Sequence, residues 1–534
     1  MRKIFLGFLV CSIAAAAVNP AADTWQALES VTASQENGII TLRSVTDAYG
    51  IYRFVYAVSA DSPKTLKLSF RYRTAADKAA NASFAITWMW YGADGKELKN
   101  KGSYKPLTPS VKEFRRALQL IDVPKDAARL EVRFQTQGAG GGGKFVPSYI
   151  ELADLALASF GQTEESLMLL TKPLTKSTAE KRWPKNGLRG VNTVTFGPIG
   201  ANTTDPGEYI SEAAFKRMSD WNINLLRLWV NVDSESIWNV KKGETMPPIP
   251  DDDPMAPYKR HLDGIRVALH LAEKYNMQVI ITTSDIIGRK IDVMFTGSAG
   301  TGYEQELVKV WWYIVREFGT HPNVIGYDLL NEPNTKEEME LWQKQIMPVL
   351  CKEVRTLDNN TYLIIEPGPW GLPWGFEKFT PIDDPKVVYS FHHYMPHTYT
   401  HQGIGGYKSA EYINKPYPGM LKLFPSDSAM MWDKAALEKS MAIAIDFAQK
   451  NNAIMWVGEF SAIRWAPGAS RWIKDSIDIF EKYGWSWAYH CYRGWNGWNP
   501  TFDPGEPDSN DPDGGKTTES LTVLTDAWKK NMRP

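Results

Sequence analysis

Two glutamates stand at the ends of apolar runs, where they could act as a catalytic pair. The stretch GYDLLNEPN ends in Asn331, Glu332 and Pro333, and the stretch IMWVGEF carries Glu459. Proline cannot continue a β-ladder, so the first run is predicted to stop where Glu332 emerges. One carboxyl group that protonates a leaving oxygen and one carboxylate that attacks an anomeric carbon are what glycoside hydrolysis needs.

Other side chains at the ends of apolar runs could support such a pair. Arg227 in LLRLWV could stabilise the negative charge of a nucleophile. Asn331 could hydrogen-bond a sugar 2-hydroxyl group, a contact that strengthens in the transition state. His392 and Tyr394 alternate along one face, and a tyrosine hydroxyl beside a carboxylate could hold it ionised and aligned.

Three further carboxylates lie within or directly after the apolar runs and are also candidates for the site. Glu366 and Asp285 also follow apolar runs, but neither has a neighbouring amide like Asn331. We therefore predict that they contact substrate or support the site. Asp328 lies inside its run and is predicted to be a buried structural carboxylate.

The elements that must position these groups are eight apolar runs alternating with amphipathic helices. The runs are GLRGVNTV, NLLRLWV, QVIITTSD, VIGYDLLNE, YLIIEPG, VVYSFHHY, IMWVGEF and WSWAYHCY. The predicted helices are Tyr258–Tyr275, Tyr303–Phe318, Lys336–Thr356, Lys434–Gln449 and Ala469–Tyr483. This alternation predicts an α/β fold, a (β/α)8 TIM barrel, whose active site lies at the C-terminal ends of the strands. Strands four and seven then face each other, which could bring the two carboxyl groups to about 5 Å, the retaining geometry.

The N-terminal part has a different texture. TLKLSFRYRT and FAITWMWY alternate apolar and polar residues, which predicts an all-β sandwich. Trp88 and Trp90 could form a sugar platform or belong to the sandwich core. We expect a leader at residues 1–22, the sandwich at 23–160, a linker at 161–184 and the barrel at 185–534.

The leader and the composition restrict the location and the partners. MRKIFLGFLVCSIAAAAVNPAAD has a basic start, an apolar centre and small residues, as in a secretory signal peptide, so we expect a secreted or periplasmic protein. No later segment is long and apolar enough for a membrane span. A net charge of -1 gives no reason to expect nucleic acid as a partner. We expect a monomer that meets a polysaccharide substrate.

Tryptophan is abundant, with 21 among 534 residues, and its flat amphipathic ring suits the face of a sugar. Loop tryptophans at a barrel mouth have no core to fill, so they are predicted to stack on a glycan. These residues are Trp370, Trp374, Trp495 and Trp498.

The motifs together resemble one family. NEP at Asn331–Pro333, the arginine of LLRLWV, SFHHY at Ser390–Tyr394 and GEF at Gly458–Phe460 are similar in order and spacing to glycoside hydrolase family 5, the cellulase family of clan A. The resemblance covers about residues 187–533. It implies a retaining mechanism with Glu332 as acid/base and Glu459 as nucleophile. It also implies that Arg227, Asn331, His392 and Tyr394 position the sugar. The N-terminal sandwich resembles the carbohydrate-binding modules attached to such enzymes.

Two departures from the family leave the sugar open. The third run ends in Ser284, where family members often carry histidine, and the last run has Trp487-Ala488-Tyr489-His490 in place of W-x-Y-W. Either Trp487 or His490 is therefore predicted to form the floor of the subsite for the cleaved sugar. We predict an enzyme that cleaves a β-linked plant polysaccharide, with endo-β-1,4-glucanase as the first choice. A β-mannanase, xyloglucanase, xylanase or exo-acting β-glycosidase would use the same mechanism, and a non-catalytic glycan-binding protein is the alternative from another class.

Neither a cofactor nor a metal is predicted. His393, His397 and His401 are four residues apart, but this spacing ligates zinc only in a helix, and Pro396 interrupts it. The acidic loop at residues 503–517 does not fit the EF-hand pattern, because Pro512 falls inside it.

Overall fold

The computed structural model forms two compact units, one up to residue 161 and one beginning at residue 162. It describes most residues between 25 and 532. The longer stretches outside the description are residues 1–24, 161–168, 194–209, 232–254, 285–302, 334–341 and 506–515, with shorter gaps elsewhere. The predicted leader and Asp285 therefore lie outside the described residues.

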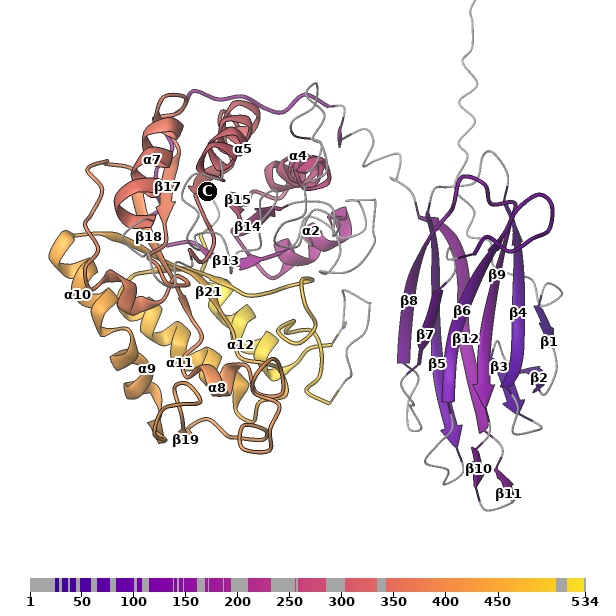
Figure 1. Cartoon of the computed structure of the whole chain (residues 1–534). Helices are drawn as coiled ribbons and strands as arrows, with labels where there is room; N and C mark the ends of the chain where they lie inside the picture. The colour runs from indigo at the N-terminus through magenta and orange to yellow at the C-terminus, as the bar shows by residue number, and fades with distance from the viewer. Residues whose placement is uncertain are drawn as a thin grey trace, which may run out of the picture. The chain divides into compact units, whose positions relative to one another are not determined.

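The first unit contains two five-stranded antiparallel sheets and a small hairpin (Figure 1). One sheet has the order β1-β4-β9-β6-β7, made of Trp25–Ala27, Tyr49–Ala57, Arg129–Gln137, Ser83–Tyr91 and Ser103–Pro106. The other has the order β2-β3-β12-β5-β8, made of Val31–Glu36, Ile39–Ser44, Ser148–Phe160, Thr65–Ala76 and Arg115–Asp122. The hairpin pairs β10 (Ala139–Gly141) with β11 (Lys144–Val146).

The two sheets of the first unit share one apolar core. Leu68 and Phe70 from one sheet and Phe134 from the other lie in the same buried cluster. Both Trp88 and Trp90 belong to this core, with exposed fractions of 7% and 0%. Of the two interpretations of these tryptophans, the structure therefore supports the core.

The second unit is a closed parallel barrel, as the sequence predicts. Its strands follow chain order: β13 Arg189–Asn192, β14 Leu225–Val230, β15 Gln278–Thr283, β16 Val324–Asp328, β17 Tyr362–Ile365, β18 Val387–His393, β21 Ile454–Phe460 and β22 Ser486–Tyr489. Strand β22 pairs with β13, which closes the ring. A hairpin of β19 (Gly419–Leu421) and β20 (Met430–Trp432) lies in the insert that follows β18.

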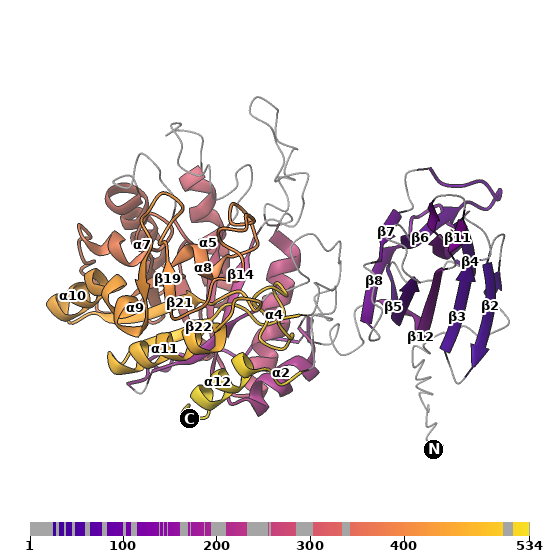
Figure 2. The same cartoon turned by 90° about the horizontal axis from the view of Figure 1, so that it is seen from below.

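Helices surround the barrel (Figures 1 and 2). They are α2 Glu212–Asp220, α4 Lys259–Lys274, α5 Tyr303–Phe318, α7 Met347–Arg355, α8 His397–Thr400, α9 Lys434–Ser440, α10 Ala442–Asn451, α11 Ala469–Lys482 and α12 Glu519–Trp528. Three of them start at a side-chain cap, as at Ser211, whose hydroxyl accepts a hydrogen bond from the Ala214 N–H group. Among the described helices, none is long and apolar enough to cross a membrane.

Two predicted helices differ from the structure. The segment predicted as Lys336–Thr356 is described from Trp342 onward, where a π-helical turn, Trp342–Ile346, precedes α7. The segment predicted as Lys434–Gln449 is divided at Met441 into α9 and α10.

The inner face of the barrel changes from apolar to polar along the strands. At the N-terminal half, an inward layer contains Leu225, Ile280, Ile364, Val388 and Ala488. Side chains alternate in direction along a strand, so the next inward position lies two residues later. There the strands carry Arg227, Thr282, Glu366, Ser390 and His490. This alternation places a polar layer at the C-terminal ends.

The segment predicted as a linker lies partly on the barrel. Residues 172–185 cross the N-terminal ends of the strands, and we call them the basal strap. The ammonium group of Lys181 is buried and donates to the Gly319 carbonyl and the Thr361 hydroxyl, both at 2.7 Å. Burial lowers the pKa of Lys181 to about 8. Trp183 packs against the inner apolar layer, and its indole N–H group donates to Ser486.

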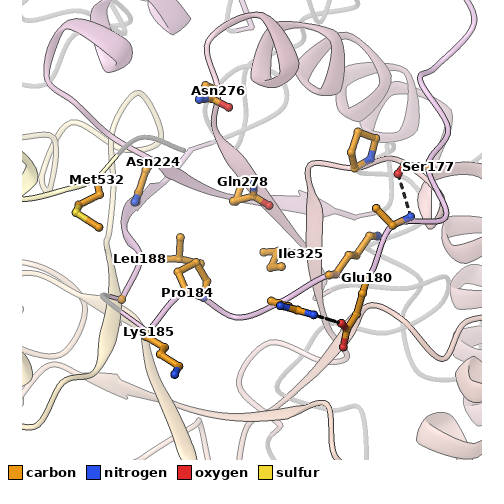
Figure 3. A pocket seen from close by; sticks show the side chains of 15 residues that line it. Ser177, Glu180, Pro184, Lys185, Leu188, Asn224, Asn276, Gln278, Ile325 and Met532 are labelled. Carbon is orange, nitrogen blue, oxygen red and sulfur yellow. Dashed lines mark hydrogen bonds and ion pairs between the residues drawn. The ribbon is translucent and has the colours of Figure 1, made fainter.

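Beside the basal strap is a cavity of about 410 Å³ (Figure 3). Pro184, Leu188, Gln278 and Ile325 are among its lining residues. Because these residues stand at the N-terminal ends of the strands, the cavity is at the opposite end of the barrel from the polar layer.

Candidate active site

Arg227 on β14 is the centre of the polar layer. It is fully buried and contacts three carboxylates. Its Nη1 atom lies 2.6 Å from Glu459 Oε1, and its Nη2 atom lies 3.0 Å from Glu366 Oε1. Its Nε and Nη2 atoms donate to Asp328 Oδ2 at 2.8 and 2.6 Å. A guanidinium group whose five N–H donors are fixed in a plane can hold several carboxylates in one geometry.

Glu459, near the end of β21, is held as an anion. Besides Arg227, its carboxylate accepts a hydrogen bond from the Tyr394 hydroxyl at 2.7 Å, and His490 Nδ1 lies 3.4 Å away. Burial alone would raise the pKa of Glu459, but the charges of His490, His392 and Arg227 lower it to about 2. A carboxylate in this state can act as a nucleophile at neutral pH.

Glu332 lies just beyond β16, and its surroundings shift its pKa in the direction opposite to that of Glu459. Its side chain is 29% exposed, and its Oε1 atom lies 2.7 Å from His392 Nδ1. Loss of solvation raises the pKa of the Glu332 carboxyl group, although the His392 contact opposes the rise. A carboxyl group that keeps its proton longer is suited to be a general acid.

The two glutamates stand close together. An oxygen of Glu332 and an oxygen of Glu459 lie within 4.8 Å of each other. Retaining glycosidases have carboxyl groups about 5–5.5 Å apart, whereas inverting ones need more room for a water molecule. The two sides of this small gap therefore carry a carboxyl group whose pKa is raised and a carboxylate whose pKa is lowered.

Asp328 is the buried structural carboxylate that the sequence predicted. Its side chain is 0% exposed, and Oδ2 is bound by Arg227. Burial is the main cause that raises the pKa of Asp328 to about 7. Asp328 anchors the guanidinium group through Nε and Nη2, whereas Glu459 contacts Nη1.

Asn331 and Asn192 fix Arg227 further. The side-chain oxygen of Asn331 accepts from Nη2 at 2.7 Å, and that of Asn192 accepts from Nη1 at 3.1 Å. The Asn192 amide group also donates to the Gly458 carbonyl at 2.8 Å. Sequence reasoning missed Asn192, although it stands at an inward position of β13, two residues after Gly190.

Aromatic rings line the Glu459 side of the gap. The ring of His490 lies 6.4 Å from that of Trp229 and 5.4 Å from that of Trp498. Trp498 also lies 5.7 Å from Tyr394. Trp495 packs edge-on against Trp498, with ring centroids 5.0 Å apart.

The structure corrects the interpretation of Trp487. Its side chain is 0% exposed and points toward the helices, where its ring lies 5.5 Å from Phe460 and its N–H group donates to Glu481. Trp487 therefore cannot form the floor of a sugar subsite. Of the two candidates, only His490, the first residue after β22, reaches the site.

Trp370 lies in the loop after β17 on the Glu332 side. It is 39% exposed, and its backbone N–H group donates to the Pro333 carbonyl at 3.0 Å. Its φ of 53° is uncommon for a residue other than glycine. The loop thus carries an exposed indole and is tied by its backbone to Pro333, the residue after Glu332.

The three histidines with four-residue spacing do not gather in the described structure. His393 stacks on Trp472 at 5.2 Å. His397 and His401 stack on each other at 3.8 Å, and their Nδ1 atoms contact the hydroxyl groups of Tyr407 and Thr400.

A different set, Glu332, His392 and Glu459, has ligand atoms close enough for a metal ion. Arg227 already neutralises Glu459 at 2.6 Å, and His392 Nδ1 is directed at Glu332. A cation between these groups would be repelled by the guanidinium group, so this set does not suit a metal.

A closed barrel with an acid and an anion facing across its C-terminal mouth defines a glycoside hydrolase of the retaining type. The comparison of sequences agrees. The profile of the cellulase family, glycosyl hydrolase family 5, matches residues 184–496, and the chain belongs to this family.

Two named relatives share moderate sequence identity with this chain. Endoglucanase C of Acetivibrio thermocellus is 28% identical over 266 residues, which cover 46% of this chain and 77% of the relative. Cellodextrinase A of Ruminococcus flavefaciens is 23% identical over 301 residues, which cover 55% and 81%. The solved structure of Thermotoga maritima Cel5A with cellobiose is 20% identical and covers 64% of this chain and 98% of its own, with a TM-score of 0.47.

Proposed function

We propose that the protein is a secreted, monomeric endo-β-1,4-glucanase in which Glu332 is the acid/base and Glu459 the nucleophile. The observation that carries the two roles is the pair of opposite pKa shifts on carboxyl groups within 4.8 Å of each other. The choice of a β-1,4-glucan rests on relatives whose names are endoglucanase and cellodextrinase. The leader sequence supports secretion, and a site made by one chain needs no partner subunit.

The reaction follows from the positions of the two carboxyl groups. Neutral Glu332 protonates the glycosidic oxygen while Glu459 attacks the anomeric carbon, which gives a covalent glycosyl-enzyme. Glu332, now an anion, then takes a proton from water, and the water displaces Glu459. Arg227 and Tyr394 hold the nucleophile during both steps.

The aromatic residues suggest how the chain of sugars lies. His490 lies 3.4 Å from Glu459 and Trp498 packs on His490, so these two rings are proposed to hold the sugar that becomes covalently bound. Trp370 adjoins Glu332, the proton donor, and is proposed to stack on the leaving sugar. Trp495 supports Trp498 from behind. The amide nitrogen of Asn331 remains to donate to a sugar hydroxyl, since its oxygen is taken by Arg227.

The first unit is proposed to be a carbohydrate-binding module. The support is that an all-β unit occurs in the same chain as a glycoside hydrolase unit. Because Trp88 and Trp90 are buried, any binding surface would use other residues.

The test is an assay of the wild type and Glu459→Ala on carboxymethylcellulose, mixed-linkage β-glucan, xyloglucan, glucomannan and arabinoxylan. Products are sized by chromatography. We expect the wild type to shorten the β-glucan chains internally and the variant to be inactive. Cleavage of only mannan or xylan, or release of only one small product, would contradict the endo-glucanase assignment.

A matched control is Asp475→Ala. Asp475 is a buried carboxylate on α11 that also accepts from a tyrosine and an arginine, Tyr417 and Arg471, at 3.0 Å each. It stands outside the polar layer, so its loss should reduce stability without abolishing cleavage. If both variants lose activity equally, Glu459 has no special role.

A further inference from the structure

Glu366, the first residue after β17, contacts both Arg227, which binds Glu459, and His392, which binds Glu332. Its side chain is fully buried. One oxygen, Oε1, lies 3.0 Å from Arg227 Nη2 and 3.1 Å from His392 Nε2. The other oxygen, Oε2, accepts the backbone N–H group of Glu332 at 2.8 Å.

Arg227 and the Glu332 backbone donate hydrogen bonds to Glu366, whereas His392 Nε2 is within ion-pair distance but is not aligned for a hydrogen bond. A carboxylate offers acceptors on both oxygens, whereas an amide would turn its NH2 group toward one set of donors. In Glu366→Gln, that NH2 group must face either Arg227 and His392 or the N–H group of Glu332. The position therefore requires an anion.

The Glu332 backbone needs this support. Its φ of 48° lies in the left-handed region, which is unfavourable for a residue other than glycine. The hydrogen bond to Glu366 holds the peptide group in that conformation and so directs the side chain toward His392.

Gly371 shows how tightly Glu366 is enclosed. A Cβ atom at Gly371 would lie 2.7 Å from Glu366 Oε2, and the φ of this glycine is +63°. The Gly371 carbonyl group also accepts the backbone N–H group of His392 at 2.7 Å. One turn thus closes over Glu366 and His392 together.

We propose that Glu366 is a positioning residue for the acid/base, which it aligns through the Glu332 backbone and through a doubly protonated His392. The proposal rests on the role of Glu332 proposed above. Glu366 itself does not touch substrate and exchanges no proton in the reaction.

The charge state of His392 follows from its neighbours. Burial would lower the pKa of His392, but the negative charges of Glu366 and Glu459 raise it well above the usual range. The other charged or titratable groups around this imidazole and Glu366 are Arg227, Asp328, Glu332, Tyr394 and His490.

The test compares aryl β-cellobiosides with good and poor leaving groups. Only the poor ones need protonation by Glu332. In Glu366→Gln, kcat/KM for the poor leaving group should fall about 10–100-fold, part of the 10²–10⁴-fold effect of a general acid. The value for dinitrophenyl cellobioside should change less than about threefold. Equal losses on both substrates would overturn the proposal, because a general structural defect affects both.

Glu332→Ala separates this proposal from the one on which it rests. If Glu332 is the acid/base, this variant loses activity on the poor leaving group, and azide restores turnover of the dinitrophenyl substrate as a glycosyl azide. Failure of that result rejects the role of Glu332 itself. Success there, with an unselective loss in Glu366→Gln, rejects only the role of Glu366.

Glu481→Gln is the matched control. Glu481 also accepts from an arginine and another donor, Arg189 at 2.7 Å and Trp487 at 3.1 Å. These contacts lie on the face of β22 that is turned toward the helices, away from the polar layer. This variant should lower thermal stability without changing the ratio between good and poor leaving groups.

A second measurement does not depend on folding of Glu366→Gln. The ¹⁵N spectrum of histidine-labelled wild type, with His392 assigned by its loss in His392→Asn, should show both ring nitrogens protonated at pH 7. A neutral His392 in the wild type overturns the proposal. Where Glu366→Gln folds, its His392 should lose a proton at lower pH than in the wild type.

Discussion

Replacing Tyr394 by phenylalanine tests how the anionic state of Glu459 is maintained. The hydroxyl group of Tyr394 donates to Glu459 Oε2 at 2.7 Å and stabilises the ionised form. A hydrogen bond to a charged group contributes about 1.5–3 kcal/mol, and one pKa unit corresponds to about 1.4 kcal/mol. Its removal should therefore raise the pKa of Glu459 by about one to two units, from about 2 to about 3–4.

The assay is the pH dependence of kcat/KM, with each profile normalised to its own plateau. Glu459 must be ionised in the free enzyme, so activity is lost as the pH falls through its pKa. The acid limb of Tyr394→Phe should thus lie about one to two pH units above that of the wild type, because the variant lacks the hydrogen bond that stabilises ionised Glu459. Samples held at each pH and assayed at pH 6 exclude acid unfolding as the cause.

Tyr399→Phe is the control for this substitution. Tyr399 is also buried, and its hydroxyl group donates to the Pro467 carbonyl at 3.0 Å, away from Glu459. Its acid limb should coincide with that of the wild type. The reasoning is refuted if the limb of Tyr394→Phe does not move, or moves to lower pH.

Three other outcomes are expected. Trp498→Ala should lower kcat/KM for glucan roughly tenfold through loss of a stacking surface, whereas Trp487→Phe should lower the melting temperature and leave KM unchanged, since Trp487 is buried behind the barrel. Gly190→Ala should lower the free energy of unfolding by about 1–3 kcal/mol in denaturant titration, because its Cβ atom would lie 2.3 Å from the Leu225 carbonyl oxygen, while Gly406→Ala, with nothing within 4 Å, should be neutral. EDTA should leave the initial rate of glucan hydrolysis unchanged, because arginine and imidazole groups already neutralise the carboxylates; inhibition reversed by a divalent cation would contradict this.

The sequence predicted the barrel because its signal is repeated eight times. Each apolar run and each helix supports the same architecture, so an error in one helix, such as the division at Met441, does not change the fold. The partners of Glu459 could also be predicted. Arg227 lies on β14 and Tyr394 directly follows β18, and both strands belong to the same barrel as β21, which carries Glu459.

Other features depend on side-chain direction, which a short run does not determine. Trp487 on β22 and His490 just beyond it are three residues apart, and only the structure shows that the first faces the helices. The contacts of Glu366 were equally hidden, since its three neighbours come from β14, the segment after β16, and β18. Asn192 carried a weak signal, the inward position on β13.

The basal strap has a consequence for how such chains exchange parts during evolution. A recombination event that joined a new N-terminal unit at residue 184 would delete Lys181 and Trp183, and with them the groups that seal the barrel floor. The carbonyl group of Gly319 would lose the ammonium donor of Lys181, and the hydroxyl group of Ser486 would lose the indole donor and keep the Leu188 N–H group. We therefore expect viable crossovers to fall upstream of residue 172, so that the catalytic unit is inherited together with its own floor.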